Sequence, residues 1–306
     1  MIRNARLGDF ISYFLGDLRG CLNQAYPRNS IASSGQAISL KNLIWPVLKP
    51  YSNDQKHVTV ADGMHMLALA IVRARSGKSW ELSNFYTSKS NHVSLTGLLE
   101  ECVRSVGDRG CERIFWRLKS GDPVQDVAAR VGFNFLAEER AYSPAIRISR
   151  PEHFAMLKFR PLVALDLYDV FRLYNECTPQ SVRSLYALTM EQWQSAREQV
   201  GPSNEEFVWE REGRLRGWIR IIHGNPQPVV DVMLHPNEIA TTPLLVGEVL
   251  RLCEGYNFPV WIVQEYQQEI RQILEENGWV AGFSYRLCVK RLVKSVENAA
   301  MVTLRA

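Results

Sequence analysis

Two carboxylates stand in stretches that otherwise suit buried strands. Asp231 interrupts the apolar run from Val229 to Met233. Glu81 lies at the start of a strand-like segment that covers residues 79–86. A carboxylate among apolar residues needs a partner or an open cleft, and in a cleft it can accept or relay a proton. Glu81 and Asp231 are therefore the candidate catalytic residues, and for Glu81 the competing interpretation is a solvated carboxylate at a strand end.

A second candidate is the polar stretch from Thr87 to Leu99, which leads into a helical pattern. Its residues are small and mostly uncharged, apart from Lys89 and His92. The N-terminus of a helix presents free backbone N–H groups and the positive end of the helix dipole, so it attracts phosphate. The stretch is a candidate anion site, to which Lys89 adds a positive charge. An ordinary exposed lysine is the alternative.

The overall composition of the chain is that of an ordinary globular protein, whose helices and strands must position these residues. It has 306 residues, of which 46% are hydrophobic and 22% charged. This composition excludes disordered, collagen-like and coiled-coil proteins, and the length favours two domains. No stretch resembles a membrane helix, and the residues after Met1 do not form an apolar signal core. The expectation is a soluble, cytoplasmic protein.

The six cysteines give no sign of a metal site. They form no C-x-x-C pair and no Cys/His cluster with zinc spacing. The simplest interpretation is buried, reduced thiols in a reducing compartment. No metal cofactor is expected. The chain has no run rich in Lys and Arg, so no nucleic-acid partner is expected either.

An internal repeat organises the chain. A shift of 146 positions superposes the C-terminal part of the first half on that of the second without a gap. The matched positions predict a helix, a strand, a second helix and a Gly-aromatic pair before a last strand. They are Leu99, Val103 and Val106 with Leu245, Val249 and Leu252; Ile114 to Trp116 with Val260 to Ile262; Val124, Val127 and Ala128 with Ile270, Ile273 and Leu274; and Gly132-Phe133 with Gly278-Trp279.

The two copies divide the chain into a domain over residues 1–150 and a domain over residues 151–306. Each begins with an Arg-x5-Asp pair, Arg3/Asp9 and Arg160/Asp166. Residues 1–150 carry 20 Lys and Arg against 13 Asp and Glu, and residues 151–306 carry 16 against 19. The positive first half is the better place for an anionic ligand, unless the difference is only drift in surface charge.

The order of these elements resembles the GCN5-related N-acetyltransferase (GNAT) family. The resemblance lies in the two Arg-x5-Asp pairs, in the leucine pairs Leu98-Leu99 and Leu244-Leu245, and in the sequences Val131-Gly132-Phe133 and Asn277-Gly278-Trp279. It covers nearly the whole chain. It implies a mixed α+β fold, α/β/α in layers, with a mostly antiparallel sheet, present as two tandem GNAT acyl-CoA N-acyltransferase folds.

The resemblance also implies a chemistry. In the family, acetyl-CoA lies in a V-shaped opening between the fourth and fifth strands, and its pantetheine pairs with the fourth strand. Its pyrophosphate lies at the start of the central helix. In the first half this implies that acetyl-CoA, the expected co-substrate, binds Phe85, Tyr86, Thr87, Lys89, Asn91, Ser94, Thr96 and Gly97. Glu81 or Asp231 would polarise water near an attacking amine.

Both copies depart from the family pattern. The glycine-rich pyrophosphate loop is degraded in the first half, and in the second it is short and contains Glu238 and Pro243. The position of the family's catalytic tyrosine falls on Ala128 in the first half and on Leu274 in the second. Tyr142 and Tyr266 lie near these positions in the sequence, but spacing alone does not assign either a role.

Two hypotheses follow. The first is an acyl-CoA-dependent N-acyltransferase that acetylates a small-molecule or peptide amine, with CoA bound by the N-terminal half. The second is a catalytically degenerate GNAT-fold protein that binds a ligand or acts as a scaffold. Either would be a monomer or homodimer without membrane or nucleic-acid partners. The state of the opening between the fourth and fifth strands distinguishes the two hypotheses.

Overall fold

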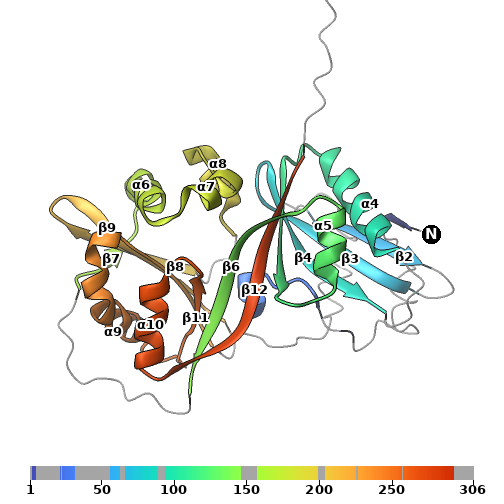
Figure 1. Cartoon of the computed structure of the whole chain (residues 1–306). Helices are drawn as coiled ribbons and strands as arrows, with labels where there is room; N and C mark the ends of the chain where they lie inside the picture. The colour runs from blue at the N-terminus through green and yellow to red at the C-terminus, as the bar shows by residue number, and fades with distance from the viewer. Residues whose placement is uncertain are drawn as a thin grey trace, which may run out of the picture.

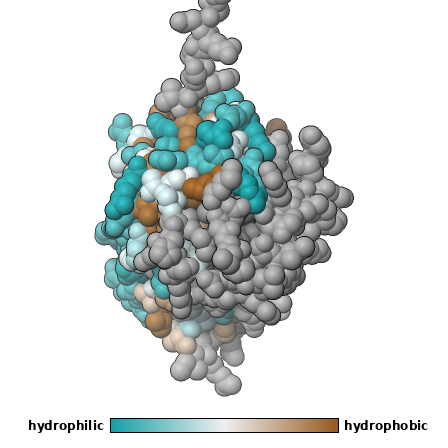
Figure 2. Space-filling model, turned by 90° about the vertical axis from the view of Figure 1, so that its right-hand side faces the viewer, coloured by the Kyte–Doolittle hydropathy of each residue, from teal (hydrophilic) through white to brown (hydrophobic). Residues whose placement is uncertain are grey.

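The computed structural model describes residues 2–4, 21, 23–31, 56–62, 66–88, 94–145, 157–198, 204–224, 227–256 and 258–292. Asp9, Lys89, Asn91 and His92 lie outside this set, as does the junction at residues 150 and 151. Within these ranges no helix is both long and apolar enough to cross a bilayer. On the side where α4 lies, the described atoms are mainly hydrophilic, with apolar atoms in small separate groups (Figure 2).

Within the described residues each half contributes six strands, and short helices pack on the sheet that these strands form (Figure 1). The elements of the first half are β1 (Ile2–Asn4), α2 (Arg28–Ile31), β2 (Lys56–Asp62), β3 (Met66–Ser76), β4 (Ser79–Thr87), α4 (Leu95–Gly107), β5 (Arg113–Lys119), α5 (Val124–Arg130) and β6 (Asn134–Pro144). The elements of the second half are β7 (Arg160–Pro161), η1 (Ala164–Asp166), α6 (Leu167–Cys177), α7 (Gln180–Tyr186), α8 (Met190–Ala196), β8 (Asn204–Arg211), β9 (Arg214–Ile222), β10 (Val229–Leu234), η2 (Pro236–Thr241), α9 (Thr242–Leu252), β11 (Val260–Gln264), α10 (Gln268–Glu276) and β12 (Trp279–Arg291).

All described strands join one sheet of twelve, in the order β1-β2-β3-β4-β5-β12-β6-β11-β10-β9-β8-β7. Only two of its pairings are parallel, β4 with β5 and β10 with β11. The predicted mixed α+β class with a mostly antiparallel sheet is confirmed. The order also shows that the halves exchange their last strands. β12 pairs with β5 of the first half, and β6 pairs with β11 of the second, so β6 and β12 run side by side through the centre (Figure 1).

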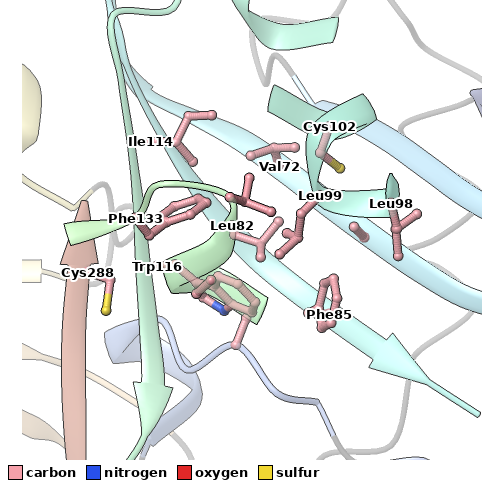
Figure 3. Packing of buried hydrophobic residues seen from close by; sticks show 14 of the residues in the cluster. Val72, Leu82, Phe85, Leu98, Leu99, Cys102, Ile114, Trp116, Phe133 and Cys288 are labelled. Atoms are coloured by element: carbon pink, nitrogen blue, oxygen red, sulfur yellow. The ribbon is translucent and has the colours of Figure 1, made fainter. Parts of the chain in front are cut away.

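The first core lies between the sheet and helices α4 and α5, where apolar side chains from both layers interlock (Figure 3). Trp116 from β5 meets Phe133 edge-on, with ring centroids 5.6 Å apart. The second half repeats this contact, because Trp261 from β11 meets Trp279 at 6.0 Å. Phe133 and Trp279 each follow a glycine with a positive φ, which is 87° at Gly132 and 83° at Gly278. The left-handed residue predicted after each helix is thus confirmed.

The predicted strand match is wrong by one residue. The shift of 146 pairs Trp116 with Ile262, yet Ile262 packs on the opposite sheet face from Trp261. Trp261 is the residue that occupies the place of Trp116. Because side chains alternate along a strand, a slip of one residue exchanges the two faces. The match of the helices and of the Gly-aromatic pairs stands.

Helices α7 and α8 cover the other face of the sheet and reach across both halves. Their C-terminal carbonyls accept hydrogen bonds from arginines of the first half. Arg113 Nη1 donates to the carbonyl of Tyr186 at 2.5 Å, and Arg75 Nη1 donates to that of Ala196 at 2.6 Å. A cation at a helix C-terminus satisfies free carbonyls and complements the dipole. The two halves therefore share a helical layer as well as a sheet.

Candidate functional site

The parallel strands β4 and β5 stay paired for only three positions before they separate. The last pair is Glu81 with Phe115. We call the space between the two strands beyond this pair the first wedge. It is filled by residues 23–26, which we call the plug segment. The backbone N–H of Gln24 donates to the carbonyl of Phe85 on β4 at 2.8 Å, and that of Tyr26 donates to the carbonyl of Arg117 on β5 at 3.0 Å.

The plug segment bonds to the free edge of β4 at Ser83 and Phe85. The Asn23 side chain accepts from the N–H of Phe85 at 2.9 Å and donates to the carbonyl of Ser83 at 3.3 Å. Ala25 is fully buried, and the Trp116 indole donates to the carbonyl of Gln24 at 3.3 Å. Three backbone groups on this edge of β4, the carbonyls of Ser83 and Phe85 and the N–H of Phe85, are therefore already bonded to the protein's own chain.

Three residues expected to bind the cofactor lie on this strand, and each has a contact within the protein. The Phe85 ring is buried in the first core against Trp116, with centroids 5.0 Å apart. The Tyr86 hydroxyl accepts from the Asn84 amide at 3.1 Å. Thr87 donates to the Gln24 side chain at 3.0 Å, which holds the plug segment in place.

The start of α4 holds the other described residues of the expected cofactor site. Ser94 is the N-cap, and its hydroxyl accepts from the N–H of Gly97 at 3.1 Å. This bond uses one of the N–H groups that an anion would need. A Cβ on Gly97 would come within 2.9 Å of Ile2, so the glycine allows β1 to approach the helix. Thr96 is half-buried.

The strands β10 and β11 separate after the pair of Val230 with Trp261. We call the space beyond it the second wedge. Here side chains bridge the strands. The Gln267 amide donates to the carbonyl of Val232 at 2.8 Å and accepts from the N–H of Gln264 at 3.0 Å. The Cys177 thiol lies 3.2 Å from the carbonyl of Leu234, placed to donate to it.

The start of α9 offers no open helix end. The 3₁₀ helix η2 runs directly into it, so the N–H of Thr242 already donates to the carbonyl of Ile239. Pro243 removes a further donor. Glu238 is buried within η2 and pairs with Arg211 at 2.8 Å. A buried carboxylate beside the helix start opposes a pyrophosphate there.

Beside the second wedge lies a central cavity of about 130 Å³, between the sheet and helices α6 to α8. Its helix-side wall is largely aromatic, with Tyr174, Tyr186 and Trp193. Its sheet side is charged, with residues from β3, β5, β6, β9 and β10. The volume exceeds that of a single water many times over, so it can hold a small organic molecule.

Buried ion pairs form the floor of the central cavity. Arg117 Nε and Nη2 contact Glu139 and Glu198, both at 2.5 Å. Arg28 Nη2 contacts Glu139 at 3.0 Å. Burial raises the pKa of Glu139 and Glu198, but the Arg117 and Arg28 guanidiniums outweigh it, so both pKa values lie below their usual range. The four groups stay charged and hold β5, β6, α2 and the end of α8 together.

Asp231 behaves differently from these glutamates. It forms an ion pair with Arg28, whose Nη1 lies 2.5 Å from Oδ1. Burial raises its pKa to about 6, although Arg28 and Arg220 lower it. Glu139 and Glu198 add to the increase. A buried carboxylate that titrates near neutral pH is suited to proton transfer.

Glu81, unlike Asp231, is paired with two arginines and lies outside the central cavity. Its carboxylate pairs with Arg73 and, at 2.9 Å, with Arg75, both from the adjacent strand β3. It is buried but is not among the residues that line the central cavity. The structure therefore places Asp231 in the cavity and Glu81 outside it. It does not bring the two candidate catalytic residues into one site.

The two tyrosines near the expected position of the catalytic acid, Tyr142 and Tyr266, are both held inside the protein. The Tyr142 hydroxyl donates to Glu275 at 2.9 Å on the α10 side. Tyr266 lines the cavity, and burial raises the pKa of its phenol well above its usual value.

The sequence interpretation missed the arginines and glutamates of the cavity floor. A signal for part of them exists, because Arg113 and Arg117 are four residues apart in β5 and Arg73 and Arg75 are two apart in β3, so each pair shares one strand face. Charges at even spacing in an otherwise apolar strand indicate an ionic face.

No protein-family model matches the chain, and no curated protein matches it. Among solved structures, a GCN5-related N-acetyltransferase from Sphaerobacter thermophilus is 14% identical and has a TM-score of 0.55, with 95% of each chain covered. A tandem GNAT protein from the clavulanic acid biosynthesis pathway is 12% identical and has a TM-score of 0.53, with 95% of this chain and 98% of that chain covered. The chain therefore has the GNAT fold over nearly its full length.

Proposed function

We propose that this protein is a GNAT-fold ligand-binding protein in which the first half no longer uses acyl-CoA. The observation that carries the proposal is the plug segment. It bonds to the carbonyl of Ser83 and to both backbone groups of Phe85. An acyl-CoA in the first wedge would have to displace these bonds together with the fully buried Ala25. The residues present do not fit the co-substrate there.

The second half supports the same conclusion by other means. Gln267 bridges the second wedge, and Glu238 lies buried beside the start of α9. Beside the second wedge the central cavity is open, with its aromatic wall and charged floor. Residues 1–150 and 151–306 would then be two copies with separate duties, the first supplying structure and the second enclosing the ligand.

Acetyl-CoA binding tests the proposal directly. A ligand that binds only the native state stabilises it, by about 2.7 kcal/mol at a hundredfold excess over Kd. We expect no heat on isothermal titration of the full chain and no change in Tm at millimolar acetyl-CoA. Binding with a submillimolar Kd would overturn the proposal. Free CoA serves as the control for the nucleotide part.

A second candidate function is N-acyl transfer to an amine in the second half, favoured by Asp231. Its pKa of about 6 and its place in the cavity suit a group that takes the proton of an attacking amine. Thiol release from acetyl-CoA would be measured over a panel of primary amines. If this function is real, Asp231→Asn lowers the rate by roughly 100-fold or more. Glu248→Gln, which neutralises a buried carboxylate outside the cavity, leaves it unchanged.

A further inference from the structure

Arg220 is a buried guanidinium that forms no ion pair with any described residue. It lies on β9, lines the central cavity and is 6% exposed. Its Nε donates to the Asn204 side-chain oxygen at 3.0 Å and its Nη2 to the carbonyl of Glu198 at 2.5 Å, and both acceptors are neutral. Its Nη1 has no hydrogen-bond partner within the described part of the chain. The sequence between these two contacts, residues 199–203, contains no acid.

The four other arginines that line the cavity differ from Arg220, because each forms an ion pair. The pairs are Arg28 with Glu139 and Asp231, Arg117 with Glu139 and Glu198, Arg75 with Glu81, and Arg197 with Glu206. Glu81 also pairs with Arg73. With Arg220 included, six guanidiniums share these five carboxylates among the described residues. When all five carboxylates are ionised, this group of side chains therefore carries one positive charge in excess.

The pKa values of the arginines show the same difference. Burial lowers the pKa of Arg28 and Arg117, but the carboxylates beside them outweigh burial and raise both pKa values above the ordinary one. Burial also lowers the pKa of Arg220, and there it is not outweighed. Asp231 lies opposite Arg220 in the pairing of β10 with β9, but its carboxylate is paired with Arg28. Because Asp231 offsets the charge of Arg220 only in part, an added anion would stabilise this cation.

The wall that faces Arg220 is apolar and aromatic. Helix α6, which carries Tyr174, packs against β9 and β10. Tyr174 and Trp193 lie with ring centroids 6.2 Å apart, and Trp218 lies two residues before Arg220, on the same face of β9. The Trp218 indole already donates to Glu206 at 2.9 Å, so its ring offers packing alone. Flat, rigid aromatic surfaces suit a ligand with an apolar or aromatic body.

We propose that the central cavity binds a small aromatic monocarboxylate, whose carboxylate pairs with Arg220 and whose ring packs against Tyr174 and Trp218. The planar guanidinium matches the two oxygens of a carboxylate. One excess positive charge favours a monoanion over a dianion such as a phosphate ester. The cavity of about 130 Å³ is close in size to apolar cavities that hold benzene. This inference rests on the proposed ligand-binding function.

Four probes test the assignment by isothermal titration on the unmodified full chain. Benzoate has the charge and the ring, benzamide has nearly the same shape without the charge, acetate has the charge without the ring, and phenyl phosphate is a dianion. We expect benzoate to bind and each of the others to bind about tenfold or more weakly. Equal binding of benzamide would overturn the charge pairing, and equal binding of acetate would overturn the role of the aromatic wall. Equal or tighter binding of phenyl phosphate would overturn the carboxylate.

The variant Arg220→Gln tests where the carboxylate lies. It should weaken benzoate about tenfold or more while leaving benzamide nearly unchanged. Arg220→Lys keeps the positive charge without the planar fork, and should restore part of the affinity. Arg251→Gln is the matched control, because it removes a guanidinium of α9 away from the cavity, and it should change neither affinity. Equal loss for both probes in Arg220→Gln would overturn the pairing and show that Arg220 only supports the fold.

The result is separable from the test of the proposed function. Absence of binding by both benzoate and 3-phenylpropanoate at millimolar concentration would overturn the carboxylate assignment. It would leave the outcome of the acetyl-CoA titration untouched. Acetyl-CoA binding, in turn, would overturn the proposed function whether or not benzoate binds.

Discussion

At the separation of β4 from β5 the protein inserts backbone, whereas at the separation of β10 from β11 it inserts side chains. The plug segment bonds to both strands of the first wedge through its own peptide groups. In the second wedge, Gln267 makes the bridge through one flexible amide. The same strand geometry is thus closed in two ways within one chain.

The difference teaches how two copies of a fold can take separate duties. A backbone plug leaves little room, and Ala25 at its centre is fully buried. A bridge made of one side chain leaves space beside it, and the central cavity lies there. The two candidate catalytic carboxylates, Glu81 and Asp231, also differ between the two regions. Glu81 is held by two arginines of β3, whereas Asp231 has a raised pKa and faces the cavity.

Arg117→Met should lower the free energy of unfolding more than any other variant considered, because Arg117 contacts both the first wedge and the floor of the central cavity. Arg117 supports the first wedge through its bond to the carbonyl of Tyr26 at 3.1 Å, and it neutralises Glu139 and Glu198 in the cavity floor. Loss of one partner of a buried ion pair costs about 3–5 kcal/mol. Urea unfolding measures the change. The matched control Arg104→Met, at an exposed ion pair, should lower the free energy of unfolding far less, and equal losses would refute a special role for Arg117.

Asp231→Asn should sharpen the contrast between the two carboxylates. Asp231 faces Arg28 on α2, Arg220 on β9, Glu139 on β6 and Glu198 after α8. Its pKa in the folded state, about 6, lies above the ordinary 3.8. The stability that it contributes is therefore complete below about pH 4 and is lost as the pH rises through about 6.

The variant lacks this loss and should be more stable than the parent protein at pH 7 by about 1–3 kcal/mol. The two proteins should converge near pH 4. Thermal unfolding across this range measures the difference. A variant that is less stable at pH 7 would mean that the ion pair with Arg28 stabilises the ionised carboxylate more than burial destabilises it.

Asn23→Ala and Gln267→Ala compare the two closures directly and should have the smallest effects. Each side chain bonds to backbone across its wedge. Each loss should cost about 1–2 kcal/mol, because buried backbone groups lose partners. The backbone bonds of the plug segment survive in Asn23→Ala, so this variant should still bind no acetyl-CoA. Acetyl-CoA binding by Asn23→Ala alone would mean that the first wedge opens readily.

Local sequence patterns predicted the secondary elements and the fold class well. Apolar spacing predicted α4, α5, α9 and α10, and Gly132 and Gly278 predicted the ends of α5 and α10. The Arg160/Asp166 pair is a real ion pair at 2.6 Å, and it holds the chain entry to α6. These features depend on residues close in sequence, which is why periodicity and spacing suffice.

The features that decide function depend on distant residues. The plug segment has no regular pattern, and nothing local indicates that Gln24 meets Phe85. The partners of Asp231 come from α2 and β9, so the sequence identified a carboxylate in need of a partner without naming one. The roles expected for Lys89 and Asn91 remain predictions, since both lie outside the described residues.

The exchange of β6 and β12 has a consequence for how the chain folds. β5 and β6 both pair with β12, which comes last in the sequence among the described strands. Until it is made, each presents an open edge that can pair with another chain. Pairings that join distant parts of a sequence also slow folding. Newly made copies of this protein should therefore depend on chaperones until synthesis passes residue 291.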